Sequence, residues 1–141
     1  MDNAGKQALL EQGLARAAEK IGDVTAPVIA RFYERHPGAA TTFDQLWPGR
    51  REALEGEMVE RVIYCLMGWF DYPGEIEIML LGSVPHHAQT LKVPPEWYSG
   101  LMEAVAETIV AEVPPERTEE LAVWEELRRE LVDLVRLSGS S

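Results

Sequence analysis

The longest amphipathic stretch of the chain covers residues 51–70, with the sequence REALEGEMVERVIYCLMGWF. Its apolar side chains recur every three or four positions, which places them along one face of an α-helix: Leu54, Met58, Val62, Leu66 and Trp69. The sequence DYPG at 71–74 then breaks the pattern. The stretch therefore predicts a long amphipathic helix.

The sequence on both sides of this stretch follows the same helical periodicity. We expect further helices over residues 6–21, 23–36, 75–92, 94–113 and 117–137, with at most a short helical turn within 37–49. We find no convincing strand pattern, no internal repeat and no linker. The chain is therefore predicted to be a single all-α domain over residues 1–137, followed by a disordered tail, SGSS, at 138–141.

The charge balance bears on the partners that the protein can bind. The 141 residues include 13 basic and 24 acidic side chains, which gives a formal net charge of −11. Binding to nucleic acid or to an anionic membrane surface needs clustered lysine and arginine, so neither is expected as a partner. No apolar run approaches the roughly 18 residues that a membrane-spanning helix requires. The single cysteine, Cys65, excludes an internal disulfide, and the polar N-terminus lacks a secretory signal, so we expect a cytoplasmic protein.

Two of the three histidines, His86 and His87, stand next to each other near the end of a predicted helix. Neighbouring helical residues point about 100° apart, so at most one of the two imidazoles can face the core. An imidazole that faces an apolar cavity can supply an axial nitrogen to haem iron, while the apolar walls exclude water. A structural histidine remains the alternative from these residues alone.

Two segments of the chain resemble the globin family. The segment FYERHPGAATTFDQL at 32–46 is similar to the globin segment in which a proline opens a helix and a phenylalanine follows six residues later, here Pro37 and Phe43. The segment HHAQTLKVPPEWY at 86–98 resembles the one that carries the proximal histidine. The resemblance covers residues 6–137 and implies a globin fold, with six to eight helices that enclose a pocket for haem b (iron protoporphyrin IX).

The resemblance also implies roles for individual residues. His87 is the expected axial ligand of the iron, Phe43 stacks on the haem, and Val93 touches the ring from the corner after the histidine helix. His86 is expected either to contact a haem propionate or to lie in solvent, and Lys92 is a further candidate for a propionate. Three residues of the following helix are expected to line the haem, although they would be core residues in any case: Trp97, Tyr98 and Leu101.

The distal side of the expected pocket departs from globins that carry a polar residue over the bound ligand. Counting from Pro37 places Ile29 over the iron, and two helical registers remain open for the long helix, one with Met58 and Val62 and the other with Leu54 and Met58. Neither register supplies a histidine, so the distal pocket is expected to be apolar. Coordination of the iron by the Met58 sulfur, or a movement of Arg50 or Tyr33 into the pocket, remains an alternative.

The expected function is the binding of diatomic gases (oxygen, carbon monoxide or nitric oxide) at the iron held by His87. One alternative is a haem enzyme, such as a nitric oxide dioxygenase or a peroxidase-like protein, which would depend on a separate reductase. Others are a gas or redox sensor module and a globin fold without haem. The oligomeric state is left open between a monomer and a homodimer.

Overall fold

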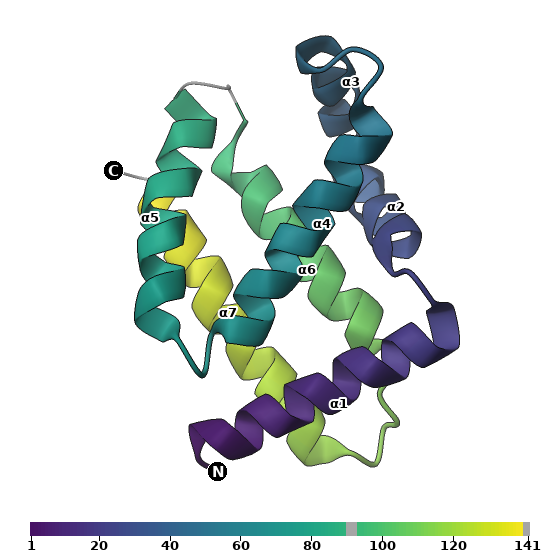
Figure 1. The fold of residues 1–141 in the computed structure, drawn as a ribbon, viewed down its shortest axis with the longest axis vertical. Coiled ribbons are helices and arrows are strands. Elements are labelled where there is room, and N and C mark those ends of the chain that lie inside the picture. The colour runs from purple at the N-terminus through teal and green to yellow at the C-terminus, as the bar shows by residue number, and fades with distance from the viewer. Residues whose placement is uncertain (90–92, 140–141) are drawn as a thin grey trace.

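A computed structural model describes residues 1–89 and 93–139, without the side chains of residues 84, 85, 87–89 and 139. The described residues form seven α-helices and contain no strand (Figure 1). The helices are α1 (Asn3–Ile21), α2 (Thr25–Arg35), α3 (Pro37–Leu46), α4 (Arg51–Gly68), α5 (Pro73–Gln89), α6 (Pro95–Val110) and α7 (Thr118–Gly139). The all-α prediction is confirmed. None of these described helices is both long enough and apolar enough to cross a membrane.

Helix α6 lies at the centre of the molecule. It packs against α1, α2, α4, α5 and α7, and most of its residues from Ser99 to Ile109 are buried. Figure 1 shows α4 crossing α6 on one side, α7 following α6 on the other, and α1 lying across the end of the domain opposite α3. The sequence of α6 suits this position, because its apolar and small residues occur all round the helix and not along one face only.

Local sequence signals define several of the helix ends. The Asp2 carboxylate accepts a hydrogen bond of 2.8 Å from the Gly5 N–H and so caps α1. Gly22 ends the same helix with φ = 81°, in the left-handed region that glycine enters without steric cost. Proline occupies the first position of α3 and of α6, where its missing N–H leaves no hydrogen bond unmade.

Two helices differ from the sequence-based prediction. Residues 37–46 form a ten-residue helix, α3, where we expected at most a short turn. Burial of Ala39 and Phe43 against α2 and α4 compensates for the weak helix propensity of Gly38 and the two threonines of this segment. Helix α7 extends to Gly139, two residues into the expected tail, and the buried Ser138 hydroxyl donates to the Leu134 carbonyl at 2.8 Å.

Candidate functional site

A cavity of about 220 Å³ lies between α4 and α6, with α2 and α3 closing one end. Its lining is mostly apolar and aromatic and consists of Phe32, Phe43, Trp47, Leu54, Glu57, Met58, Arg61, Val62, Val93, Trp97, Tyr98 and Leu101. Eight of the eleven predicted site residues are among them: Phe43, Leu54, Met58, Val62, Val93, Trp97, Tyr98 and Leu101. The structure therefore brings together, from three helices and one loop, residues that are up to 58 positions apart in the sequence (43 to 101).

Phe43 lies at the centre of an aromatic cluster on the cavity wall. Its ring stacks with that of Phe32 at a centroid distance of 6.5 Å and an interplanar angle of 18°. The Trp97 ring meets it edge-on at 5.9 Å and 83°, and the Trp47 ring is tilted against it at 6.4 Å. Such contacts hold the flat faces of aromatic rings in fixed orientations. Phe43 and Phe32 are almost fully buried, so these two rings are shielded from solvent.

The α4 wall of the cavity combines both helical registers that the sequence left open. Leu54, Met58 and Val62 all contact the cavity, since they are four residues apart and share a helix face. Glu57 and Arg61, also four residues apart, lie on the flank of that face and are exposed to solvent. The cavity is therefore apolar in its interior and bears one negative and one positive side chain on its solvent-exposed edge.

Tyr98 links the cavity to α5. Its hydroxyl oxygen lies 2.8 Å from the Ser83 Oγ in a part-buried hydrogen bond. Burial raises the pKa of Tyr98, because the charged phenolate is disfavoured away from water, although the bond to Ser83 acts in the opposite direction. The tyrosine therefore stays protonated, and its hydroxyl is held by Ser83.

On the α2 side of the cavity, the lining residue differs from the one that the sequence predicted. Ile29 is buried in the core but does not line the cavity, whereas Phe32, three residues later on α2, does. The rotation of α2 against α6 decides which of these residues faces the cavity, and sequence counting from Pro37 does not contain that rotation. Tyr33 does not line the cavity either. Its hydroxyl donates to Glu55 Oε2 at 2.6 Å, which fixes the ring between α2 and α4.

The predicted histidine ligand lies in a part of the chain where only the backbone is described. The backbone of His87 belongs to α5, but its side chain is outside the described residues, as is all of Lys92. His86 is exposed to solvent. The structure therefore tests neither the axial ligand nor the propionate contacts.

Four cavity residues were missed by sequence reasoning: Phe32, Trp47, Glu57 and Arg61. Glu57 and Arg61 could have been found from the helical spacing, because they flank the apolar residues Leu54, Met58 and Val62. Charged residues on an amphipathic helix are usually solvated, however, so the spacing alone does not mark these two as cavity residues. Trp47 follows the last residue of α3, so its position depends on the extra length of that helix.

The described residues offer neither a reactive thiol nor a metal-binding cluster. Cys65 is 1% exposed, and burial raises the pKa of its thiol to about 11. The reactive thiolate is therefore scarce at neutral pH. Among the described residues, no group of three or more His, Cys, Asp and Glu side chains is placed to hold a metal ion.

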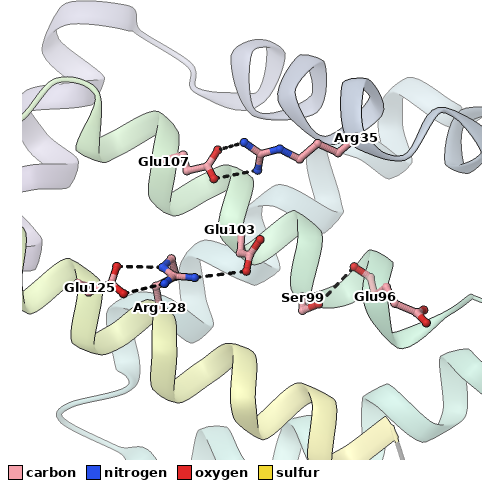
Figure 2. Close-up of polar contacts among 7 residues, drawn as sticks. All are labelled: Arg35, Glu96, Ser99, Glu103, Glu107, Glu125 and Arg128. Carbon is pink, nitrogen blue, oxygen red and sulfur yellow. Dashed lines mark hydrogen bonds and ion pairs between the residues drawn. The ribbon is translucent and has the colours of Figure 1, made fainter.

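A second cavity, of about 390 Å³, lies beside the N-terminal half of α6. It is lined by His36, Pro95, Glu96, Ser99, Gly100, Glu103 and Arg136. Figure 2 shows the polar face of α6 that continues from this cavity: Arg35 of α2 makes two hydrogen bonds to Glu107, and Arg128 of α7 bonds Glu125 and, at 3.4 Å, Glu103. The N-terminal half of α6 thus lies between an apolar cavity and a polar one.

No protein-family model, curated protein or solved structure matches this chain. The candidate site therefore rests on its own geometry.

Proposed function

We propose that the protein is a globin-type haem protein, which holds haem b in the aromatic cavity between α4 and α6 and binds a diatomic gas there. The observation that carries this proposal is the convergence of eight of the eleven residues expected from the globin resemblance on one cavity. The convergence is informative because these residues come from three separate helices and the loop before α6.

The cavity residues fit a flat, apolar ring system with an acidic edge. Phe43 presents a buried aromatic surface and Trp97 a partly buried one, and Met58 with Val62 supplies an apolar wall opposite α6. Arg61 lies at the exposed edge, where its guanidinium suits a carboxylate substituent of the ring.

The size of the cavity sets a condition on the proposal. Its volume of about 220 Å³ is smaller than the ~300–1,000 Å³ of most small-molecule sites. A haem therefore enters only if the walls move apart and if part of the ring stays at the solvent-exposed edge. We expect α3 and the segment at Val93 and Pro94 to make this movement, because Phe43 of α3 and Val93 line the cavity outside the tightly packed centre of α6.

Helix α5 supplies the proposed iron ligand. Ser83 of α5 contacts Tyr98 of the cavity wall, and position 87 follows Ser83 by four residues. Positions four residues apart share a face of an α-helix, so the helical register favours His87 over His86 as the residue on the cavity side. In this proposal His87 would hold the haem iron through an imidazole nitrogen.

Bound haem would supply an iron atom that can bind a diatomic gas. The surrounding side chains then determine how much water and how many hydrogen-bond donors reach the bound gas. Met58, Val62 and Phe32 exclude water, and the Tyr98 hydroxyl is already engaged with Ser83. A hydrogen bond to oxygen contributes ~1 kcal/mol or more to its binding, and a site with few free donors lacks this contribution. We therefore expect the protein to bind oxygen weakly relative to carbon monoxide.

The proposal is tested by titration of the purified protein with hemin, followed by absorption spectra of the ferric, ferrous and carbon monoxide-treated forms. We expect saturation at one hemin per chain. His87→Ala should abolish the ferrous-carbonyl spectrum of the parent, while the matched neighbour variant His86→Ala retains it. A parent protein that does not take up hemin stoichiometrically, or a His87→Ala variant with unchanged spectra, overturns the proposal.

A further inference from the structure

His36, at the corner between α2 and α3, contacts Gly100 of α6. A Cβ atom built on Gly100 would lie 2.6 Å from Nε2 and 3.0 Å from Cδ2 of the His36 ring. A carbon–nitrogen separation of 2.6 Å is about 1 Å shorter than ordinary van der Waals contact. The imidazole therefore occupies the space that any other residue at position 100 would need for its side chain.

Both partners of this contact are next to residues that line the apolar cavity. His36 follows the last residue of α2 and precedes the first of α3, and its ring packs against Phe32 with a centroid distance of 5.5 Å. Phe32 in turn stacks on Phe43 within the cavity. On the other side, Gly100 lies in α6 between Trp97 and Leu101, which both line the cavity.

We propose that the contact between His36 and Gly100 sets the separation between the α2–α3 corner and α6, so that residue 100 controls the width of the ligand cavity. This inference rests on the proposed function, in which the cavity holds a haem ring. Gly100 is then a positioning residue, which acts on the ligand through the walls on either side and does not touch it.

A side chain at position 100 could also be accommodated by rotation of the His36 ring, without any displacement of α6. The His36 ring is only partly buried, and it borders the second cavity, of about 390 Å³, so it could rotate into that space if residue 100 gained a side chain. The packing of the ring against Phe32 opposes the rotation. The two responses have different consequences, because a rotated ring leaves the walls in place and a displaced α6 does not.

The test is the variant Gly100→Ala, titrated with hemin. If α6 is displaced from the α2–α3 corner, the cavity of about 220 Å³ becomes wider. Because hemin enters only when the walls move apart, we then expect the hemin dissociation constant to fall by about tenfold. Removal of the imidazole should relieve the effect, so the double variant Gly100→Ala/His36→Ala is expected to bind hemin as tightly as His36→Ala alone.

Gly13→Ala is the matched control for a loss of stability alone. A Cβ at Gly13 would lie 2.9 Å from Trp124 Nε1 and 3.1 Å from Glu120 Oε2, between α1 and α7 and away from the cavity lining. We expect this variant to lower the free energy of unfolding, as overpacking does, and to leave the hemin dissociation constant unchanged. A purely structural role of Gly100 would make the two variants alike.

Binding of an apolar fluorescent dye, measured in parallel, separates failure of this inference from failure of the proposed function. A parent protein that binds the dye but not hemin refutes the haem proposal, and the inference is then judged from the dye affinities of the same variants. Unchanged affinity in Gly100→Ala, an equal change in Gly13→Ala, or a parent that binds neither compound overturns the inference.

Discussion

Arg16 of α1 and Glu120 of α7 form a two-pronged ion pair, with Nη1–Oε2 and Nη2–Oε1 distances of 2.7 and 3.0 Å. The Glu120 side chain is completely buried, and Arg117 Nε donates a third hydrogen bond to its Oε1 at 2.8 Å. A charged group without water needs partners of opposite charge, and here both carboxylate oxygens have them. The pair fixes α1 across the first turn of α7.

We predict that Glu120→Gln destabilises the protein by about 2 kcal/mol, less than the 3–5 kcal/mol of a fully buried pair because both arginines keep some contact with water. The amide cannot accept two charge-assisted bonds, so one arginine loses its partner. Urea denaturation measures the change. Glu125→Gln is the control, because Glu125 pairs with Arg128 on the surface with a 55% exposed side chain, and its loss should cost less than ~1 kcal/mol. Equal effects of the two substitutions would contradict the prediction.

The same carboxylate predicts how stability depends on pH. Burial acts to raise the pKa of Glu120, but the hydrogen bonds from Arg16 and Arg117 outweigh it and hold the pKa below the usual 4.5. In the unfolded chain Glu120 therefore takes up its proton at a higher pH than in the folded protein. The stabilisation is fully present above about pH 5 and is lost as the pH falls through the folded-state pKa. We expect the parent to lose stability more steeply below pH 5 than Glu120→Gln; parallel curves would exclude Glu120 as the cause.

The hydrogen bond between Tyr33 of α2 and Glu55 of α4 is predicted to contribute to the free energy of unfolding. Tyr33→Phe removes a 2.6 Å donor from Glu55 and should lower the free energy of unfolding by about 1–2 kcal/mol. Tyr64→Phe is the control, since Tyr64 is 56% exposed and loss of its hydroxyl should change the free energy of unfolding by no more than ~0.5 kcal/mol.

Burial and the hydrogen bond to Glu55 also raise the pKa of Tyr33 well above 10.0. The phenol therefore stays protonated at pH 10 to 11, and Tyr33→Phe should leave the phenolate absorbance in that range unchanged.

Cys65 is predicted to be unreactive in the folded protein. Its side chain is buried among core residues of α4, and its thiol has a pKa of about 11. A disulfide reagent should therefore label the thiol slowly under native conditions and promptly in denaturant, since the thiolate is the reacting form. Prompt labelling of the native protein at neutral pH would show that α4 opens locally.

The sequence predicts the number and type of the helices well, because long stretches with a 3.6-residue period have few alternative structures. It predicts α3 poorly. Gly38 and the two threonines of α3 have weak helix propensity, and the helix depends on burial of Ala39 and Phe43 by partners distant in the sequence. The apolar cavity residues Met58, Val62 and Leu101 could be predicted from spacing, since each belongs to an amphipathic helix whose apolar face has to be buried.

The remaining cavity residues depend on tertiary geometry that the sequence does not state. Ile29 and Phe32 are both apolar positions of α2, and only the orientation of that helix against α6 selects Phe32 for the lining. The Gly100 contact could not be anticipated either, because its partner His36 is 64 positions away in the chain (100 minus 36).

Two of the four tryptophans, Trp47 and Trp97, border the apolar cavity, while the indole N–H of Trp69 donates to Glu130 at the surface and Trp124 is enclosed by the core. The molecule thus carries its own optical probe. A coloured guest between α4 and α6 would quench the ultraviolet emission of the two nearest indoles first, and occupancy could be followed at nanomolar protein without any label.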